Sequence, residues 1–551
     1  MRARLAGVSA LALVASLGIS TPVQAADDVR LVTRDGVGLQ YHWVPKATTP
    51  VTGSGATRSD FDGDGVDDIA ATSDLSLPTW NSLPYNSTGL VVVRYSSTPR
   101  VDYLTGTTEG GGCGCFGRAV ATGDFNADGY DDLVIGDSDE VDPGNQTRAG
   151  GVWILPGSST GLVVDAAGHI NQRSPGIPGE PENLDRFGVA LAAGDINGDG
   201  YDDLAIGAEG EAIGSKVEAG SVTVVFGSAS GITTTGAQDL YQDQTAVPGA
   251  SERNDRFGSG LAIGRVNNDR YADLVIGAPL ENDMVSPEGS GSVALLWGSA
   301  GGVSTSGATS ATGWGIYPAT GDANTVAWYL GSPLAIGDVN GDGLGEVVVG
   351  VPDAQTPGIY GGVLAVFTGR TAGLSDKAVR VISQRTAGIP GEPEQDDRFG
   401  ARVATGDVTG DGRADVLVSA PGEALGSNTG AGVVTLLKGS AAGLTGTGAQ
   451  SFDQNDPVIP GGAERDDRFG ASIALLNLDG TGGLDAVVAA SGEVVSGFDW
   501  PSGSTYVFHG SAGGLVPQPT STNGMDLRTD RLWPHRYGLR LAGPQGEGAY
   551  Y

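Results

Sequence analysis

The sequence is poor in the residues that carry redox chemistry and in positive charge. Its 551 residues contain two cysteines, three methionines and four histidines, and the formal charge is −34. Two cysteines cannot supply the disulfide framework of a small secreted scaffold. A polyanion is not attracted to nucleic acid or to an anionic membrane. We therefore expect no nucleic-acid partner.

Long hydrophobic runs are equally scarce. The one clear run, residues 5–19, follows Arg2 and Arg4 and precedes the small-residue site at 23–25, which is typical of a secretory signal peptide over residues 1–25. The run is shorter than a membrane span, and no later stretch is apolar enough to serve as one. We expect a secreted, extracellular protein without membrane insertion.

Recognisable catalytic motifs are also missing from the sequence. The histidines, His42, His169, His509 and His535, lie far apart, and neither a Gly-x-Ser-x-Gly nucleophile motif nor a phosphate-binding loop is present. We predict no catalytic residue and no enzymatic activity. The two cysteines belong to the run Gly-Gly-Cys-Gly-Cys-Phe at 111–116, and in an oxidising compartment we expect a local disulfide bond.

Oxygen-bearing side chains occur instead in a regular pattern. The nine residues from Asp195 to Asp203 read Asp-Ile-Asn-Gly-Asp-Gly-Tyr-Asp-Asp. Side-chain oxygens fall at positions 1, 3, 5 and 9, and a glycine at position 6 makes the turn that lets position 7 offer its main-chain carbonyl. Ca²⁺ prefers six to eight such hard oxygen ligands. The stretch therefore predicts a calcium loop.

Seven copies of this loop recur about every 70 residues, which indicates a repeat architecture. They begin at Asp60, Asp124, Asp195, Arg265, Asp338, Asp407 and Asn477. We predict Ca²⁺ in about five of them. The predicted ligands are Asp60, Asp62, Asp64, Val66 and Asp68; Asp124, Asn126, Asp128, Tyr130 and Asp132; Asp195, Asn197, Asp199, Tyr201 and Asp203; Asp338, Asn340, Asp342, Leu344 and Glu346; and Asp407, Thr409, Asp411, Arg413 and Asp415.

Two loops depart from the ligand pattern. The loop at Asn477 has Thr481 at position 5, and its occupancy stays open. The fourth loop has Arg265 at position 1. We predict that an arginine there replaces calcium as the counter-ion of Asp269 and Asp273. The alternatives are that Arg270 takes this place or that Arg265 faces solvent.

The segments between the loops indicate short strands. In the third repeat, residues 186–193, 204–208, 220–226 and 239–242 are strand-like, and glycine and Asx residues fill the turns. Four short strands in each repeat predict an all-β fold, a seven-bladed β-propeller of four-stranded antiparallel blades, over residues 51–551. Residues 26–50 match no repeat, and we expect strands there on both sides of a turn at Asp35-Gly36.

The repeats resemble the FG-GAP family. Phe257-Gly258, a loop, and then Gly277-Ala278-Pro279 follow the family pattern, which is similar to the N-terminal propeller of integrin α subunits and to secreted actinobacterial FG-GAP repeat proteins. The resemblance implies the fold and calcium binding, and it implies no ligand. The fifth repeat departs from it with Trp328-Tyr-Leu-Gly331, and the first lacks Phe-Gly.

The end of the chain carries the piece that the first repeat lacks. Residues 536–543 copy the Arg-Phe-Gly strand and then stop. A ring whose first and last segments share one blade is expected. Because residues 56–59 align with the end of the same strand, the sequence leaves open which segment takes which position.

We expect this protein to be a monomeric binding or adhesion module whose partner is an extracellular protein or glycan. The alternatives are a carbohydrate-active enzyme, such as a polysaccharide lyase or hydrolase, and a lectin. The Asp-Arg pairs at 185–186 and 397–398 predict salt bridges between blades. Aromatic residues in irregular stretches predict a contact surface, although Trp328 and Tyr329 fit core packing equally well. They are Trp80, Tyr85, Trp314, Tyr317, Trp328 and Tyr329.

Overall fold

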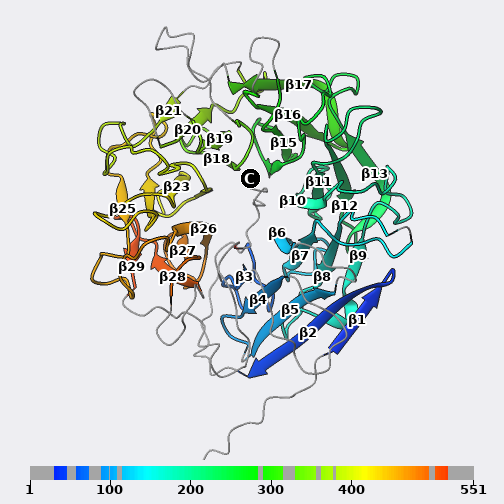
Figure 1. The fold of residues 1–551 in the computed structure, drawn as a ribbon, viewed down its shortest axis with the longest axis horizontal. Coiled ribbons are helices and arrows are strands. Elements are labelled where there is room, and N and C mark those ends of the chain that lie inside the picture. The colour runs from blue at the N-terminus through cyan, green and yellow to red at the C-terminus, as the bar shows by residue number, and fades with distance from the viewer. Residues whose placement is uncertain are drawn as a thin grey trace, which may run out of the picture.

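Seven β-sheets stand radially around a central axis (Figure 1). The computed structural model describes residues 30–45, 58–73, 89–98, 100–107, 115–144, 146–282, 289–313, 329–354, 361–375, 380–494, 503–518 and 541. The predicted signal peptide lies outside these residues. In blades two to seven the strands follow chain order from the axis outward, and neighbouring strands are antiparallel. The seven-bladed propeller is thereby confirmed.

The strands of each blade are short and separated by turns. Blade two holds β6 (Phe116–Gly123), β7 (Asp132–Asp137), β8 (Gly151–Leu155) and β9 (Gly168–Ile170); blade three holds β10 (Phe187–Gly194), β11 (Asp203–Ala208), β12 (Ser221–Phe226) and β13 (Thr233–Leu240). Blade four holds β14 (Gly260–Gly264), β15 (Asp273–Ala278), β16 (Ser292–Ser299) and β17 (Gly302–Thr312).

The remaining complete blades follow the same plan. Blade five holds β18 (Leu334–Gly337), β19 (Glu346–Val351), β20 (Val363–Phe367) and β21 (Arg380–Ile382); blade six holds β22 (Val403–Gly406), β23 (Asp415–Ala420), β24 (Val433–Leu437) and β25 (Gln450–Phe452); blade seven holds β26 (Phe469–Leu476), β27 (Asp485–Ala490), β28 (Ser504–His509) and β29 (Val516–Pro517). The described residues contain no α-helix, and η1 (Val164–Ala166) is a short 3₁₀ turn. No described helix has the length and apolarity to cross a membrane.

The hydrophobic core lies between neighbouring blades. Phe187 of blade three is buried against Ile154 and Ile170 of blade two, and Phe257 enters the next junction in the same way. Gly188, which follows this phenylalanine, has a φ of +87°, and a Cβ there would lie 2.8 Å from the carbonyl oxygen of Gly151. Only glycine allows that close approach. In the blades that carry it, the Phe-Gly pair therefore joins the blade to the one before it.

Blade one closes the ring with segments from both ends of the chain. It contains β3 (Ile69–Ser73), β4 (Leu90–Arg94) and β5 (Arg100–Thr107). Leu541 is buried and pairs with Ala71 of β3, where the innermost strand belongs. The Asp68 amide bonds to the Ser59 carbonyl at 2.9 Å. The two segments thus share one strand position, which answers the question that the sequence left open.

An N-terminal hairpin extends blade one outward. Strands β1 (Arg30–Arg34) and β2 (Val37–Pro45) join the sheet through β5, and both turn residues have positive φ, 50° at Asp35 and 86° at Gly36. Asp35 reaches blade two, where its carboxylate meets Nδ1 of buried His169 at 3.3 Å. The other ring nitrogen of His169 meets Glu140 at 3.0 Å. The expected hairpin is present, and it fastens blade one to blade two.

Strand direction gives the propeller two faces. The seven nine-residue loops and the connections from third to fourth strands lie on one face, which we call the loop face. The connections that lead into each Phe-Gly pair, and those from second to third strands, lie on the other, which we call the Phe-Gly face. Each of the sites below belongs to one of these faces.

Candidate functional site: the nine-residue loops

The loops are shaped by their own carboxylates. In the third loop, Oδ1 of Asp195 accepts the amides of Gly198 at 2.6 Å and Asp199 at 3.1 Å, and Oδ2 accepts that of Gly200 at 3.1 Å. The carboxylates of Asp60 and Asp338 accept the same three amides of their own loops. Position 1 therefore helps to curl the chain into a turn, and Gly200 at position 6, which the sequence pattern assigns to this turn, has a φ of 91°.

The carboxylate at position 9 ties each loop to the body of its blade. One oxygen of Asp203 accepts the amides of Ile196 and Asn197 at 3.0 and 3.2 Å, and the other accepts the amide of Gly227, just after β12, at 3.0 Å. Glu346, longer by one methylene, still accepts the Val339 amide at 3.0 Å. In both loops position 9 is thus buried, and each of its carboxylate oxygens accepts at least one hydrogen bond.

Burial raises the pKa of these position 9 carboxyl groups. It brings the pKa of Asp132, Asp203 and Glu346 to about 7, while backbone amides that donate to the carboxylates oppose the shift. The other carboxylates of the same loops add to it by like-charge repulsion. A loop without a cation therefore holds negative charge at a cost, which a bound cation would remove.

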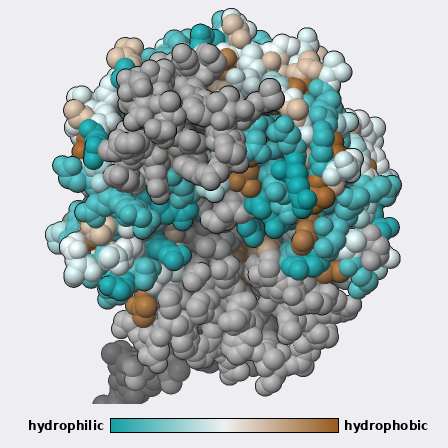
Figure 2. Space-filling view, turned by 45° about the horizontal axis from the view of Figure 1, so that its top comes forward, coloured by the Kyte–Doolittle hydropathy of each residue, from teal (hydrophilic) through white to brown (hydrophobic). Residues whose placement is uncertain are grey.

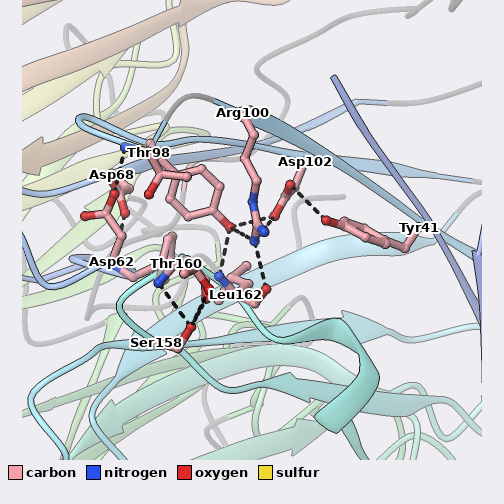
Figure 3. Close-up of polar contacts among 12 residues, drawn as sticks. Tyr41, Asp62, Asp68, Thr98, Arg100, Asp102, Ser158, Thr160 and Leu162 are labelled. Atoms are coloured by element: carbon pink, nitrogen blue, oxygen red, sulfur yellow. Dashed lines mark hydrogen bonds and ion pairs between the residues drawn. The ribbon is translucent and has the colours of Figure 1, made fainter. Parts of the chain in front are cut away.

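The first loop gathers its ligands most tightly. Asp60, Asp62 and Asp68 are buried and each place an oxygen within 4.8 Å of the others. Figure 3 shows Asp62 and Asp68 beside the turn after β4, where Oδ2 of Asp62 accepts the Thr98 amide at 3.0 Å. Oδ1 of Asp62 is buried without a hydrogen-bond partner. Three carboxylates and an unpartnered oxygen fit a hard divalent cation.

In the second, third, fifth and sixth loops the ligands are more open. Position 9 is buried, position 1 is half-buried, and position 5 is exposed. In the sixth loop the guanidinium of Arg413 pairs with Asp411 at 3.1 Å, so one predicted ligand is partly engaged. These loops keep the turn of the first loop with fewer carboxylates close together.

Main-chain hydrogen bonds link the seven loops into a closed ring. In every pair of neighbours, the amide at position 8 donates to the carbonyl at position 1 of the loop before it. The seven donors and acceptors are Asp131 to Asp60, Asp202 to Asp124, Ala272 to Asp195, Gly345 to Arg265, Ala414 to Asp338, Leu484 to Asp407, and Asp67 to Asn477, at 2.7–3.2 Å. A change in one loop therefore acts directly on its neighbour.

The fourth loop contradicts the prediction of an arginine counter-ion. Arg265 and Arg270 are both exposed, and among the described residues neither forms an ion pair with Asp269 or Asp273. The Asn267 side-chain amide donates to Asp273 at 3.4 Å instead, and the Arg270 guanidinium bonds to the Tyr271 hydroxyl at 3.1 Å. A guanidinium has no acceptor for the three loop amides that an aspartate at position 1 binds, so the side chain of Arg265 lies in solvent instead.

A histidine from outside the seventh loop contacts the carboxylates of that loop, which the sequence did not indicate. Nδ1 of His509, at the end of β28, lies 3.1 Å from Asp485 and 3.3 Å from Asp479. The three side chains form a mixed nitrogen and oxygen cluster. Because 24 residues separate His509 from Asp485, only the strand pairing of the blade could have indicated this contact.

Two further expectations concerned the cysteines and the aromatic residues in irregular stretches. Cys115 is disulfide-bonded, as expected, and Cys113 lies outside the described residues. Of the six aromatic residues, Tyr329 is 37% exposed, and the other five lie outside the described residues.

The two Asp-Arg pairs differ from each other. Arg398 does reach the preceding blade, at Asp353, but Arg186 pairs with Glu209 of its own blade. The neighbouring aspartates, Asp185 and Asp397, cap backbone amides at the start of the turn. The prediction of inter-blade salt bridges is therefore confirmed for Arg398, whereas the ion pair described for Arg186 lies within its own blade.

A cavity of about 800 Å³ opens on the Phe-Gly face among blades one, two, six and seven. Charged side chains of both signs line it, and Arg402 is buried in its wall. The others are Arg118, Arg398 and Arg468 with Glu394, Asp396, Asp397 and Asp466. Its size is that of a ligand pocket.

Comparison with known proteins agrees with this architecture. The FG-GAP repeat model matches residues 116–155, 187–225, 257–296 and 399–437, which belong to blades two, three, four and six. The chain carries FG-GAP repeats. The repeats that depart from the motif, in blades one and five, lie outside these matches.

Curated relatives share the repeat region. Integrin alpha pat-2 of Caenorhabditis briggsae is 32% identical over 237 residues, which are 41% of this chain and 18% of that protein. Phosphatidylinositol-glycan-specific phospholipase D of Bos taurus is 33% identical over 164 residues, 30% of this chain and 18% of that protein. The chain thus spans less than a fifth of the length of these relatives.

Among solved structures, a rhamnogalacturonan lyase of Bacillus licheniformis aligns with 75% of this chain and 74% of its own, at 12% identity and a TM-score of 0.30. A similarity this low supports no inference about activity.

Proposed function

We propose that this protein is a secreted, calcium-binding propeller that acts as an extracellular binding or adhesion module. The observation that carries the calcium part is the cluster of Asp60, Asp62 and Asp68, with its unpartnered buried oxygen. Calcium in the loops would supply positive charge and rigidity, and the ring of hydrogen bonds would pass that rigidity from blade to blade. The partner is an extracellular protein or glycan.

The cavity on the Phe-Gly face is the proposed binding site. It is lined by residues of both charges, and Figure 2 shows hydrophilic residues over most of the described surface in view, with hydrophobic ones in small separate patches. Such a surface suits a polar ligand better than an apolar one. The connections that form the cavity are held by the blades, whose loops bind calcium on the other face.

An enzyme remains the rival proposal, but the carboxyl groups with raised pKa favour a structural role. Glu423 and Glu493, whose pKa burial raises to about 7, are each bonded to a glutamine of the preceding blade in the same way. A catalytic acid would not be expected to recur with identical partners around the ring.

The test uses the full chain on arrays of glycans and matrix proteins, with calcium and with chelator. We expect binding that depends on calcium and falls about tenfold or more in Arg468→Glu, a change of at least about 1.4 kcal/mol. Arg465→Glu is the matched control, since Arg465 is exposed nearby and does not line the cavity. Equal binding by both variants would exclude the cavity as the site.

A further inference from the structure

A second type of acidic cluster lies on the Phe-Gly face, between blades three and four. Asp255 and Glu281 are buried, Glu252 is half-buried, and each places an oxygen within 4.8 Å of the others. Gln242, which is 3% exposed, donates its amide nitrogen to Glu281. The cluster is separate from the nine-residue loops, which lie at the other ends of the strands.

Several oxygens of this cluster are buried without a partner. They are Oδ1 of Asp255, Oε2 of Glu252 and Oε1 of Gln242. Asp255 is fully buried, and its other oxygen accepts the amide of Glu252. Burying polar oxygens without hydrogen bonds costs free energy unless something else binds them. With its carboxyl groups ionised, the cluster therefore lacks a positively charged or donating group at its centre.

Protein cations do not fill this place. Among the described residues, no lysine, arginine or histidine forms an ion pair with Glu252, Asp255 or Glu281. Burial raises the pKa of Asp255 to about 7. The charge of Lys216 opposes this rise, but its ammonium pairs with Asp243 at 2.7 Å. Burial, followed by the charge of Asp255, raises the pKa of Glu281 to about 8.

The junction between blades one and two differs from this cluster because it holds a histidine beside the glutamate. Glu140 there occupies the place of Glu281, and His169 contacts it at 3.0 Å. Burial disfavours the imidazolium, yet Glu140 and Asp35 raise the pKa of His169 to about 9, so this junction contains its own cation. At the junction of blades four and five Ala354 takes the same place, so this position carries no carboxylate.

The pair of a buried glutamine and a glutamate recurs at three other junctions that lack a histidine at this place. A glutamine amide bonds to the glutamate of the next blade in Gln172–Glu211, Gln384–Glu423 and Gln454–Glu493, and in all three the glutamine oxygen is unpartnered. In the stretch Val247-Pro-Gly249, the glycine lies over the amide of Gln242. At Gly249, with φ +93°, a Cβ would be 2.6 Å from Nε2 of Gln242, so glycine keeps room for the amide group.

We propose that Gln242, Glu252, Asp255 and Glu281 bind a divalent cation of the calcium class between blades three and four. The donors are all oxygens, carboxylate and amide, which suits Ca²⁺ better than a softer metal. Turning the Gln242 amide would direct Oε1 to the cation, and the two assignments of an amide group differ only in that rotation. The ion would join β13 to the connections of the following blade.

Crystals of the full chain grown with Mn²⁺ after chelation test this directly, through the anomalous scattering of the metal. We expect an anomalous peak among Gln242, Asp255 and Glu281. Peaks in the nine-residue loops with none at this junction would overturn the inference and leave the proposed calcium loops intact. A peak at this junction with empty loops would do the reverse.

Equilibrium dialysis with radioactive calcium gives the matching test in solution. Glu281→Gln, which keeps the size and hydrogen bonding of the side chain, should bind one ion fewer than the wild type. Glu218→Gln is the control, because Glu218 lies on the same face but pairs with Arg256 at 3.2 Å. An unchanged ion count in a folded Glu281→Gln protein would show that protons, not a metal, neutralise the cluster.

Discussion

The first and fourth loops have opposite chemistry and share a backbone framework. The first offers a buried cluster of carboxylates, whereas the fourth has arginine at positions 1 and 6. Yet Asp68 and Asp273 each accept the amide of position 2, at 3.0 and 2.9 Å, and an amide at the end of the third strand, at 2.7 and 3.0 Å. Position 9 therefore holds the loop in place, and positions 1, 3 and 5 decide whether a cation binds.

The largest expected effect is that of removing calcium from all loops at once. Each occupied loop contributes about 2.7 kcal/mol when free calcium is 100 times its Kd, and several loops add together. Thermal melting in millimolar calcium and in excess chelator should give widely separated Tm values. Coincident melting curves would show that the first loop differs from the fourth in charge only.

Replacing the carboxylate at position 9 should destabilise both kinds of loop equally. In chelator, Asp203→Ala and Asp273→Ala should each lower the free energy of unfolding by several kcal/mol, since every buried amide left without an acceptor costs about 1–3 kcal/mol. Urea denaturation measures the loss. Asp269→Ala, at an exposed position, is the control and should stay within about 0.5 kcal/mol. A harmless Asp273→Ala would mean that position 9 matters only through metal.

The pH dependence of folding stability should differ between empty loops and loops that hold calcium. The carboxyl groups of Asp132 and Asp203 have a pKa of about 7 in the folded chain, against 3.8 for an ordinary aspartate. The folded state then binds more protons than the unfolded state between these values, so its stability in chelator falls as pH rises from about 4 to 7. Calcium competes with those protons, so in calcium the slope should flatten or reverse. Tm measured across this range would reveal it, and identical slopes in both buffers would contradict it.

The smallest effect concerns a single loop. Arg265→Asp combined with Arg270→Gly gives the fourth loop the ligand pattern of the third. The variant should bind one additional calcium ion and melt at a higher temperature in calcium but not in chelator. Calcium dialysis counts the ion, and Arg270→Gly alone, which lacks the position 1 carboxylate, is the control. An unchanged count would mean that a sequence pattern is not sufficient to make a site.

The sequence predicted the features that are formed within a short stretch of the chain. Positions 1 to 9 of a loop are neighbours in the chain, so their ligand set and turn could be read directly, as could the Phe-Gly pairs and the hairpin turn at Asp35-Gly36. The direction of a side chain could not be read. Arg265 was expected to face inward because of its charge, but a guanidinium cannot accept the loop amides that an aspartate binds there, and the side chain lies in solvent.

Contacts between distant segments also stayed hidden. Leu541 closes the ring beside Ala71, His509 meets Asp485 across a blade, and Gln242 meets Glu281, which is 39 residues away. Each contact depends on strand register and on the packing of one blade against the next. A repeat pattern predicts the number of blades. The contacts can be predicted only when the positions of neighbouring blades relative to one another are known.

The most direct test of calcium binding by the loops is a high-resolution structure of the full chain crystallised in calcium. We predict an ion bound by positions 1, 3, 5, 7 and 9 in the loops that begin at Asp60, Asp124, Asp195, Asp338 and Asp407, and none in the loop that begins at Arg265. Empty loops in millimolar calcium, or an ion coordinated by Asp269 and Asp273, would contradict the account.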